Sequence, residues 1–259
     1  MYILKKISIK YNLIIFIMLY YSIAHYYDRK GARNSIKYDN IKKHIGAFLN
    51  IEEADKEFIL VSFIDTPRGE KRYEDIKRHL EDLCQKYLPN KNYHVIIEYN
   101  WGGTIAALWY THMFLSSNKK KGYVVLMEED FGPKDNHWYS AAKKKLLNNI
   151  IYVGESNIGR IKSNNDDNRI TCASYRNTTR LGNPEVWTDG GFYFSTGENL
   201  KIIEEKIGIF HKGNVNIKYS NLLDGISIGE VGFPTLLFHV GLKFDVINRS
   251  NYFINEWNG

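Results

Sequence analysis

Cysteine is scarce in this sequence, with only Cys84 and Cys172 among its 259 residues. Two cysteines are too few for a disulfide scaffold or a thiolate zinc site, although a single disulfide between them stays open. The signatures G-x-S-x-G, H-E-x-x-H and the phosphate-binding P-loop are also missing. The sequence therefore gives no reason to expect a covalent mechanism, a zinc protease or a P-loop nucleotidase.

Nucleic-acid-binding motifs are missing as well, although the formal net charge is +6. The lysines occur in short clusters such as Lys119–Lys121 and Lys143–Lys145, which are typical of a solvated surface. No stretch interleaves aromatic residues with arginine, and no zinc-finger or RNP-like pattern is present. We therefore expect no nucleic-acid partner, and a nucleoside diphosphate would be a sufficient anionic one.

The longest uncharged apolar run lies near the N-terminus. Lys5, Lys6 and Lys10 precede the run Tyr11–Ala24. Charge before an apolar run predicts a targeting segment, so we expect residues 1–27 to be a signal anchor. The protein would then be a single-pass type II membrane protein with a lumenal domain, or a secreted protein if the segment is cleaved. The alternative is a buried helix of the domain itself.

The remainder is typical of one α/β domain, with a stem and first helix at 28–56 and the catalytic domain at 57–259. Apolar, β-branched runs alternate with amphipathic segments, which predicts a doubly wound, mostly parallel sheet. The expected strands are Phe58–Ile64, Tyr93–Tyr99, Tyr123–Met127, Ile150–Val153, Gly190–Ser195 and Lys243–Ile247. The expected helices are Arg72–Leu88, Thr104–Ser116, Lys134–Asn149, Glu198–Ile207 and Phe233–Gly241.

Polar side chains follow the first three predicted strands. Asp65, Asn100 and the acidic segment Glu128–Asp130 stand at their carboxyl ends, where ligands of such sheets bind. Alternate residues of an extended segment face the same side, so Glu128 and Asp130 can both face a ligand while Glu129 faces away. Carboxylate oxygens suit a hard divalent cation, so the sequence predicts a Mn²⁺ or Mg²⁺ site here. The alternative is a solvated acidic loop that binds no metal.

Four segments together resemble the GT-A glycosyltransferases. VVLMEED resembles their strand and DxD-type metal motif, and FILVSFIDT their first strand. GGFYFSTGENLKIIEEKIG is similar to the Gly-rich strand placed against the donor sugar. DGISIGEVGFPTLLFHVGLKF resembles their later acidic segment, and all four occur in the family's order. The resemblance covers about residues 58–247 and implies a GT-A-like fold.

The resemblance also implies roles for particular residues. The metal would lie on Glu128 and Asp130, and the base would be Glu230, or Asp224 because the usual Glu-Asp pair is absent. His211 and His239 are conceivable third metal ligands, although a core position suits His239 better. The expected donor-binding residues are Asp65, Thr66 and Asn100 on the nucleotide side and Asp189, Gly190 and Gly191 near the sugar.

These expectations describe a metal-dependent transferase that moves a sugar from a nucleotide-sugar donor to a hydroxyl of a glycan or protein, with inversion. A retaining enzyme of the same fold is the nearest alternative. A non-catalytic, membrane-anchored binding protein of this fold is another. A metal-dependent hydrolase or nucleotidyltransferase on a related sheet is the third.

Overall fold

A computed structural model describes residues 18–27, 34–52, 55–99, 104–156, 189–208 and 240–255, together with Phe233 and Leu237. In this part of the chain a seven-stranded sheet has the order β3-β2-β1-β4-β7-β6-β8. All its strands are parallel except β7, which is antiparallel to both neighbours. The predicted mostly parallel α/β sheet is confirmed. The sheet strands are β1 (Leu19–Tyr26), β2 (Lys56–Phe63), β3 (Tyr93–Glu98), β4 (Tyr123–Glu128), β6 (Tyr152–Ser156), β7 (Asp189–Thr196) and β8 (Phe244–Asn248).

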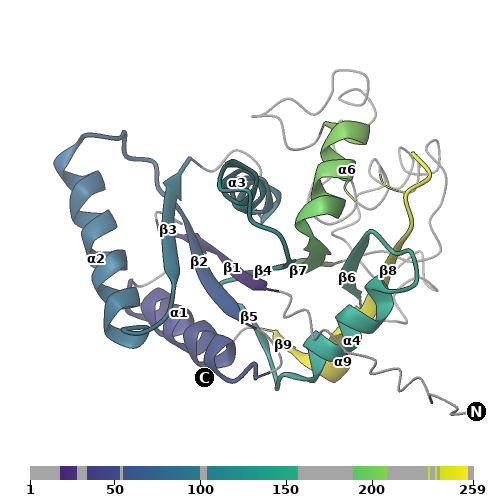
Figure 1. Cartoon of the computed structure of the whole chain (residues 1–259). Coiled ribbons are helices and arrows are strands. Elements are labelled where there is room, and N and C mark those ends of the chain that lie inside the picture. Colours follow the sequence, from purple (N-terminus) through teal and green to yellow (C-terminus); the bar gives the residue numbers. More distant parts are fainter. Residues whose placement is uncertain are drawn as a thin grey trace, which may run out of the picture.

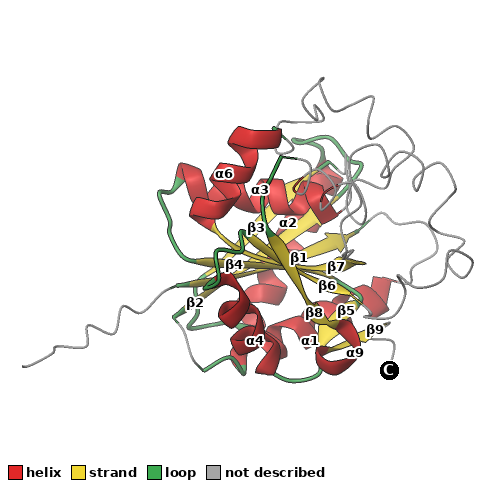
Figure 2. Ribbon diagram, turned by 90° about the vertical axis from the view of Figure 1, so that its right-hand side faces the viewer, coloured by secondary structure: helices red, strands yellow, loops and turns green. Residues whose placement is uncertain are grey.

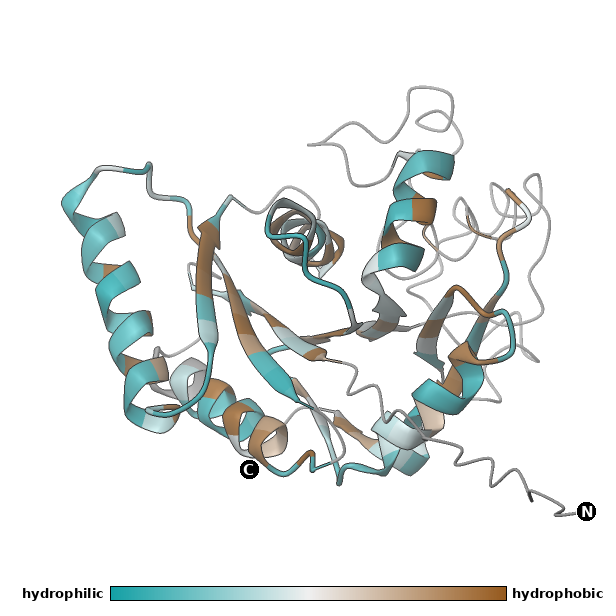
Figure 3. Ribbon diagram, viewed as in Figure 1, coloured by the Kyte–Doolittle hydropathy of each residue, from teal (hydrophilic) through white to brown (hydrophobic). Residues whose placement is uncertain are grey.

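Helices cover both faces of this sheet (Figures 1 and 2). Burial on both faces explains the continuous apolar runs FILV in β2 and YVVLM in β4, and brown segments lie among teal and white ones along the strands in Figure 3. One face packs against α3 (Thr104–Ser117) and α6 (Gly197–Ile207), and the other against α1 (Asn34–Leu49), α2 (Lys71–Tyr87) and α4 (His137–Leu146).

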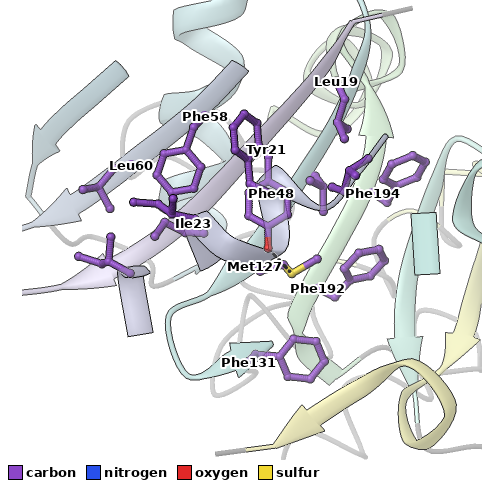
Figure 4. Close-up of a cluster of buried hydrophobic side chains, with 14 of the residues drawn as sticks. Leu19, Tyr21, Ile23, Phe48, Phe58, Leu60, Met127, Phe131, Phe192 and Phe194 are labelled. Carbon is purple, nitrogen blue, oxygen red and sulfur yellow. Dashed lines mark hydrogen bonds between the residues drawn. The ribbon is translucent and has the colours of Figure 1, made fainter. Parts of the chain in front are cut away.

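Aromatic side chains fill the core beneath α1 (Figure 4). The Tyr21 ring stacks on Phe58 at 6.0 Å between centroids. Its hydroxyl lies 3.0 Å from His44 Nδ1 and 3.4 Å from the Met127 sulfur. These contacts join β1 to β2, β4 and α1, so they hold together the strands whose carboxyl ends carry the candidate site.

The expected N-terminal anchor and stem are wrong as domain boundaries. Leu19–Tyr26 is the central strand β1, paired in parallel with both β2 and β4. Helix α1, in the predicted stem, buries Ile41, Ile45 and Phe48 against the same sheet. A central parallel strand has the composition of a short membrane segment, which explains the error. Residues 1–17 lie outside the described residues, and no helix in the described part is long and apolar enough to cross a membrane.

A two-stranded antiparallel sheet continues the chain past β4. Phe131 follows the acidic segment directly and pairs with Asn255. The short helix α9 joins this small sheet to the edge strand β8. The sequence predicted neither α9 nor the small sheet, because α9 and the two strands of this sheet are each only three or four residues long. Their bounds are β5 (Phe131–Pro133), α9 (Arg249–Tyr252) and β9 (Phe253–Asn255).

Candidate functional site at the carboxyl ends of β1 and β4

The strand order places a topological switch point between β1 and β4. From β1 the chain moves through α1 to β2 on one side, and from β3 it returns through α3 to β4 on the other side. The two helices lie on opposite faces of the sheet. They therefore flank the carboxyl end of β4 from the two faces, where Thr104 of α3 and His44 of α1 both contact Glu128, and open α/β sheets bind their ligands at such a position.

Two half-buried carboxylates lie at this switch point. Glu128 is the last residue of β4 and is paired with Ala24 of β1, and Asp130 lies in the turn that follows. The Thr104 hydroxyl donates to Glu128 Oε1, and the Tyr26 hydroxyl lies 3.4 Å from Thr104 Oγ1. Since the Thr104 proton is directed to Glu128, Tyr26 is the donor of the second bond. The ends of β1, α3 and β4 therefore orient the Glu128 carboxylate jointly.

Glu129 between them has a different environment. Its residue is 5% exposed, and its Oε2 accepts a hydrogen bond from the Tyr26 backbone N–H at 3.2 Å. The same oxygen lies 3.6 Å from His25 Nε2, and His25 Nδ1 lies 2.9 Å from the buried Ser62 hydroxyl. Glu129 thus holds β1 against β4 at the strand ends. The sequence indicated only that it points away from its neighbours, and it gave no sign of this structural role.

His44 supports the acidic segment from α1. Its Nε2 lies 3.0 Å from the Glu128 carbonyl oxygen, so this nitrogen carries the proton and donates. Its Nδ1 then accepts from the Tyr21 hydroxyl at 3.0 Å. Burial lowers the pKa of His44 to about 4, against the weaker opposing effect of hydrogen bonds to the backbone at Glu128 and Glu129. The imidazole is therefore neutral near pH 7 and fixed in one tautomer.

The predicted nucleoside contacts lie at the end of the neighbouring strand β2. Asp65 is exposed and Thr66 is buried. They follow Phe63, which pairs with Tyr26 of β1. Asp65 and Thr66 therefore belong to the same sheet edge as the acidic segment, with β1 between them.

Because β7 is antiparallel, its first residues lie at this edge too. Gly191 donates its N–H to Glu155 Oε1 of β6 at 3.2 Å. A Cβ atom at Gly191 would lie 2.6 Å from the Phe131 ring. Glycine is thus required here by packing alone. Asp189 and Gly190 belong to the strand by their backbone, and Asp189 pairs with Glu155.

The described residues bring together part of the predicted site. They contain no group of three His, Cys, Asp or Glu side chains that could hold a metal ion. Glu128 and Asp130 are two hard oxygen ligands of the predicted kind. The remaining predicted residues, Asn100, His211, Asp224, Glu230 and His239, lie outside the described residues.

A surface cavity of about 470 Å³ begins at Tyr27, one residue beyond β1. The N-terminal half of α2, from Lys71 to His79, forms its other wall. This volume is within the range of small-molecule sites. Its lining combines an aromatic ring with basic and acidic side chains: Tyr27, Lys71, Arg72, Asp75, Ile76 and His79.

Comparisons with known proteins add little to this geometry. No protein-family model and no curated protein matches the chain. Among solved structures, mouse xyloside xylosyltransferase 1 is similar with 10% identity and a TM-score of 0.47 over 90% of this chain and 86% of that one. The 4-diphosphocytidyl-2C-methyl-D-erythritol synthase of Anaerococcus prevotii has 14% identity and a TM-score of 0.48 over 93% and 90%. Similarities of this size do not assign a substrate or a reaction.

Proposed function

We propose that this protein is a metal-dependent glycosyltransferase that uses a nucleotide-sugar donor. The observation that carries the proposal is the pair of half-buried carboxylates, Glu128 and Asp130, at the switch point between β1 and β4. The order of the four sequence segments that resemble GT-A glycosyltransferases supports the same reading.

The donor set at the switch point fits a hard divalent cation. Mg²⁺ in transferases is held by one or two carboxylates together with substrate phosphates, so two protein ligands are enough. Glu128 would be presented in a fixed rotamer because Thr104 donates to it. Mn²⁺ or Mg²⁺ bound there would neutralise the charge that develops on the departing nucleoside diphosphate.

The remaining roles follow from the sheet edge. Asp65 and Thr66 would contact the nucleoside at the end of β2, with Asn100 at the end of β3. Asp189, Gly190 and Gly191 would lie along the sugar at the start of β7. The cavity at Tyr27 offers room for a further part of a ligand.

The reaction would be a single displacement at the anomeric carbon. The acceptor hydroxyl oxygen forms a bond to this carbon as the bond to the diphosphate oxygen breaks. The hydroxyl proton passes to a carboxylate base, for which Glu230 and Asp224 are the candidates, and the nucleoside diphosphate leaves with the bonding electrons. A glycan or a protein side chain would supply the hydroxyl, and the anomeric configuration would invert.

A screen of nucleotide sugars with and without Mn²⁺ tests the proposal. We expect one donor to raise the melting temperature only when Mn²⁺ is present, because a ligand that binds the native state stabilises it. Slow hydrolysis of that donor should release a nucleoside diphosphate and free sugar. Release of a sugar phosphate would instead indicate cleavage between phosphates, as in a hydrolase or nucleotidyltransferase. Binding without any turnover would indicate a binding protein.

A further inference from the structure

Four residues from separate segments form a closed set of contacts beside the acidic segment, which we call the contact ring: Phe131, Glu155, Gly191 and Arg249. Glu155 accepts from the Gly191 N–H at 3.2 Å through Oε1. Its Oε2 lies 3.8 Å from Arg249 Nε. The Arg249 guanidinium lies over the Phe131 ring, 4.9 Å from its centroid, and Phe131 occupies the space that a side chain at Gly191 would need.

A buried ion pair such as the one in this ring is by itself weak evidence for a contribution to stability. The Glu155 side chain is fully buried and that of Arg249 is 19% exposed. Removing two charges from water costs free energy that their attraction repays only in part, so a well-packed apolar pair is often equally stable or more so. At 3.8 Å the pair is also longer than a hydrogen bond. A role in orientation accounts for the charges better.

The contact ring joins the two segments to which the proposed function assigns the donor. Phe131 directly follows Asp130, and Gly191 directly follows Asp189 and Gly190. The backbone ladder between β4 and β7 ends at the pair Met127–Phe192, so beyond that pair Glu155 and Arg249 act on the spacing between the acidic segment and the start of β7. In the proposed reaction that spacing separates the diphosphate from the sugar.

We propose that Glu155 and Arg249 are positioning residues that set the place of the donor sugar relative to the diphosphate. This inference rests on the proposed glycosyltransferase function. Arginine suits the role because its planar guanidinium can lie on an aromatic ring while Nε faces a carboxylate, whereas the ammonium of lysine is a point charge that cannot make both contacts at once. Neither residue needs to touch the reacting atoms.

The inference predicts different effects on the binding of a nucleoside diphosphate and on the turnover of a nucleotide sugar. A nucleoside diphosphate needs the acidic segment and the ends of β1, β2 and β3 but not the contact ring, so it should bind normally when the contact ring is broken. The sugar should lose its orientation, and a misplacement of about 1 Å can lower turnover by as much as about 100-fold.

The experiment compares Arg249→Lys, Glu155→Gln and the double variant Glu155→Gln/Arg249→Gln in the full chain. The double variant removes both charges, so it leaves no uncompensated buried charge and is the variant most expected to fold. Lys145→Gln is the matched control, because it breaks the Lys145–Asp245 ion pair at the opposite end of β8. UDP and GDP with Mn²⁺ are the binding probes, and the nucleotide sugar that the wild type hydrolyses is the substrate.

We expect kcat to fall about 10-fold or more in all three variants, with diphosphate Kd within about twofold of the wild type and Lys145→Gln unchanged. The double variant should recover thermal stability without recovering kcat. Equal losses of diphosphate and nucleotide-sugar affinity that follow the melting temperature would overturn the inference, as would normal kcat in the double variant. A wild type that turns over no nucleotide sugar would instead reject the proposed function, and the inference with it.

Discussion

At the scale of single residues, the three consecutive acids at the end of β4 have different environments. Glu128 and Asp130 are half-buried, whereas Glu129 is buried between β1 and β4. Alternation along an extended segment predicted that Glu129 would differ from its neighbours. It could not predict the partners of Glu129, because Tyr26 and His25 lie on a strand that the sequence did not reveal.

We expect Asp130→Asn to abolish Mn²⁺-dependent donor binding and leave the fold intact. The substitution preserves shape but removes the charge that a hard cation needs. Isothermal titration of the donor with Mn²⁺ and with EDTA measures the effect. Unchanged metal-dependent affinity in this variant would remove Asp130 from the site.

Glu129→Gln should behave in the opposite way. The buried carboxylate accepts from the Tyr26 N–H and lies near His25, so its loss should destabilise the protein by about 1–3 kcal/mol. Urea unfolding measures the change. A stable Glu129→Gln protein that has lost metal binding would mean that the roles of Glu129 and Asp130 are exchanged.

Gly191→Ala should displace the start of β7 or the Phe131 ring, since its new methyl group would lie 2.6 Å from that ring. Overpacking of this kind costs about 1–3 kcal/mol, and donor turnover should fall with it. Gly197→Ala is the control, because the nearest atom to its Cβ would be 3.7 Å away. The melting temperature and turnover of Gly191→Ala should be lower than those of Gly197→Ala. Equal values in the two variants would show that the Phe131 ring can move aside without a loss of stability.

At the scale of elements, β1 is the central strand that could not be predicted from the sequence. β2, β3, β4, α2 and α3 were predicted because turn residues or caps bound each apolar run. The run at Tyr11–Ala24 has no such boundary and follows three lysines. A parallel strand buried on both faces is as apolar as a membrane segment, so composition alone could not distinguish the two.

The described structure therefore predicts that deleting residues 1–30 unfolds the protein. The deletion removes β1, which pairs with β2 and β4 along its length. Ile23→Ala is a milder test, because this side chain is fully buried and its truncation should cost about 2–5 kcal/mol. Circular dichroism and urea unfolding measure both. A folded deletion variant would contradict the placement of β1.

At the scale of the whole molecule, the two ends of the sheet have different chemistry. The carboxyl end carries the candidate site, whereas the amino end carries an ionic cluster around the buried Glu57. There Glu57 accepts from Lys120 and lies 3.0 Å from His94 Nε2. Burial alone would raise the pKa of Glu57, but Lys120 and His94 hold it below its ordinary value of 4.5.

This shift predicts acid sensitivity far from the site. A carboxyl group with a lowered pKa contributes stability above its unfolded value, and that stability is lost as the pH falls below about 4.5. Glu57→Gln should cost about 1–3 kcal/mol at pH 7 and lose less on acidification to pH 4 than the wild type. Urea unfolding at both pH values measures this. The donor affinity of this variant at pH 7 should equal that of the wild type. A loss of donor affinity would show that the amino end of the sheet affects the candidate site at the carboxyl end.

The pairing of β1 with β4 also bears on how the chain folds. The contact between Tyr26 and Glu129 spans 103 residues, so a long loop must close before the central sheet is complete. Closure of such loops is entropically costly, and folds dominated by distant contacts form slowly. Glu128 becomes the neighbour of Ala24 on β1 only after this closure. Nucleotide binding would therefore appear late during refolding and would serve as a kinetic signal that the last central pairing has formed.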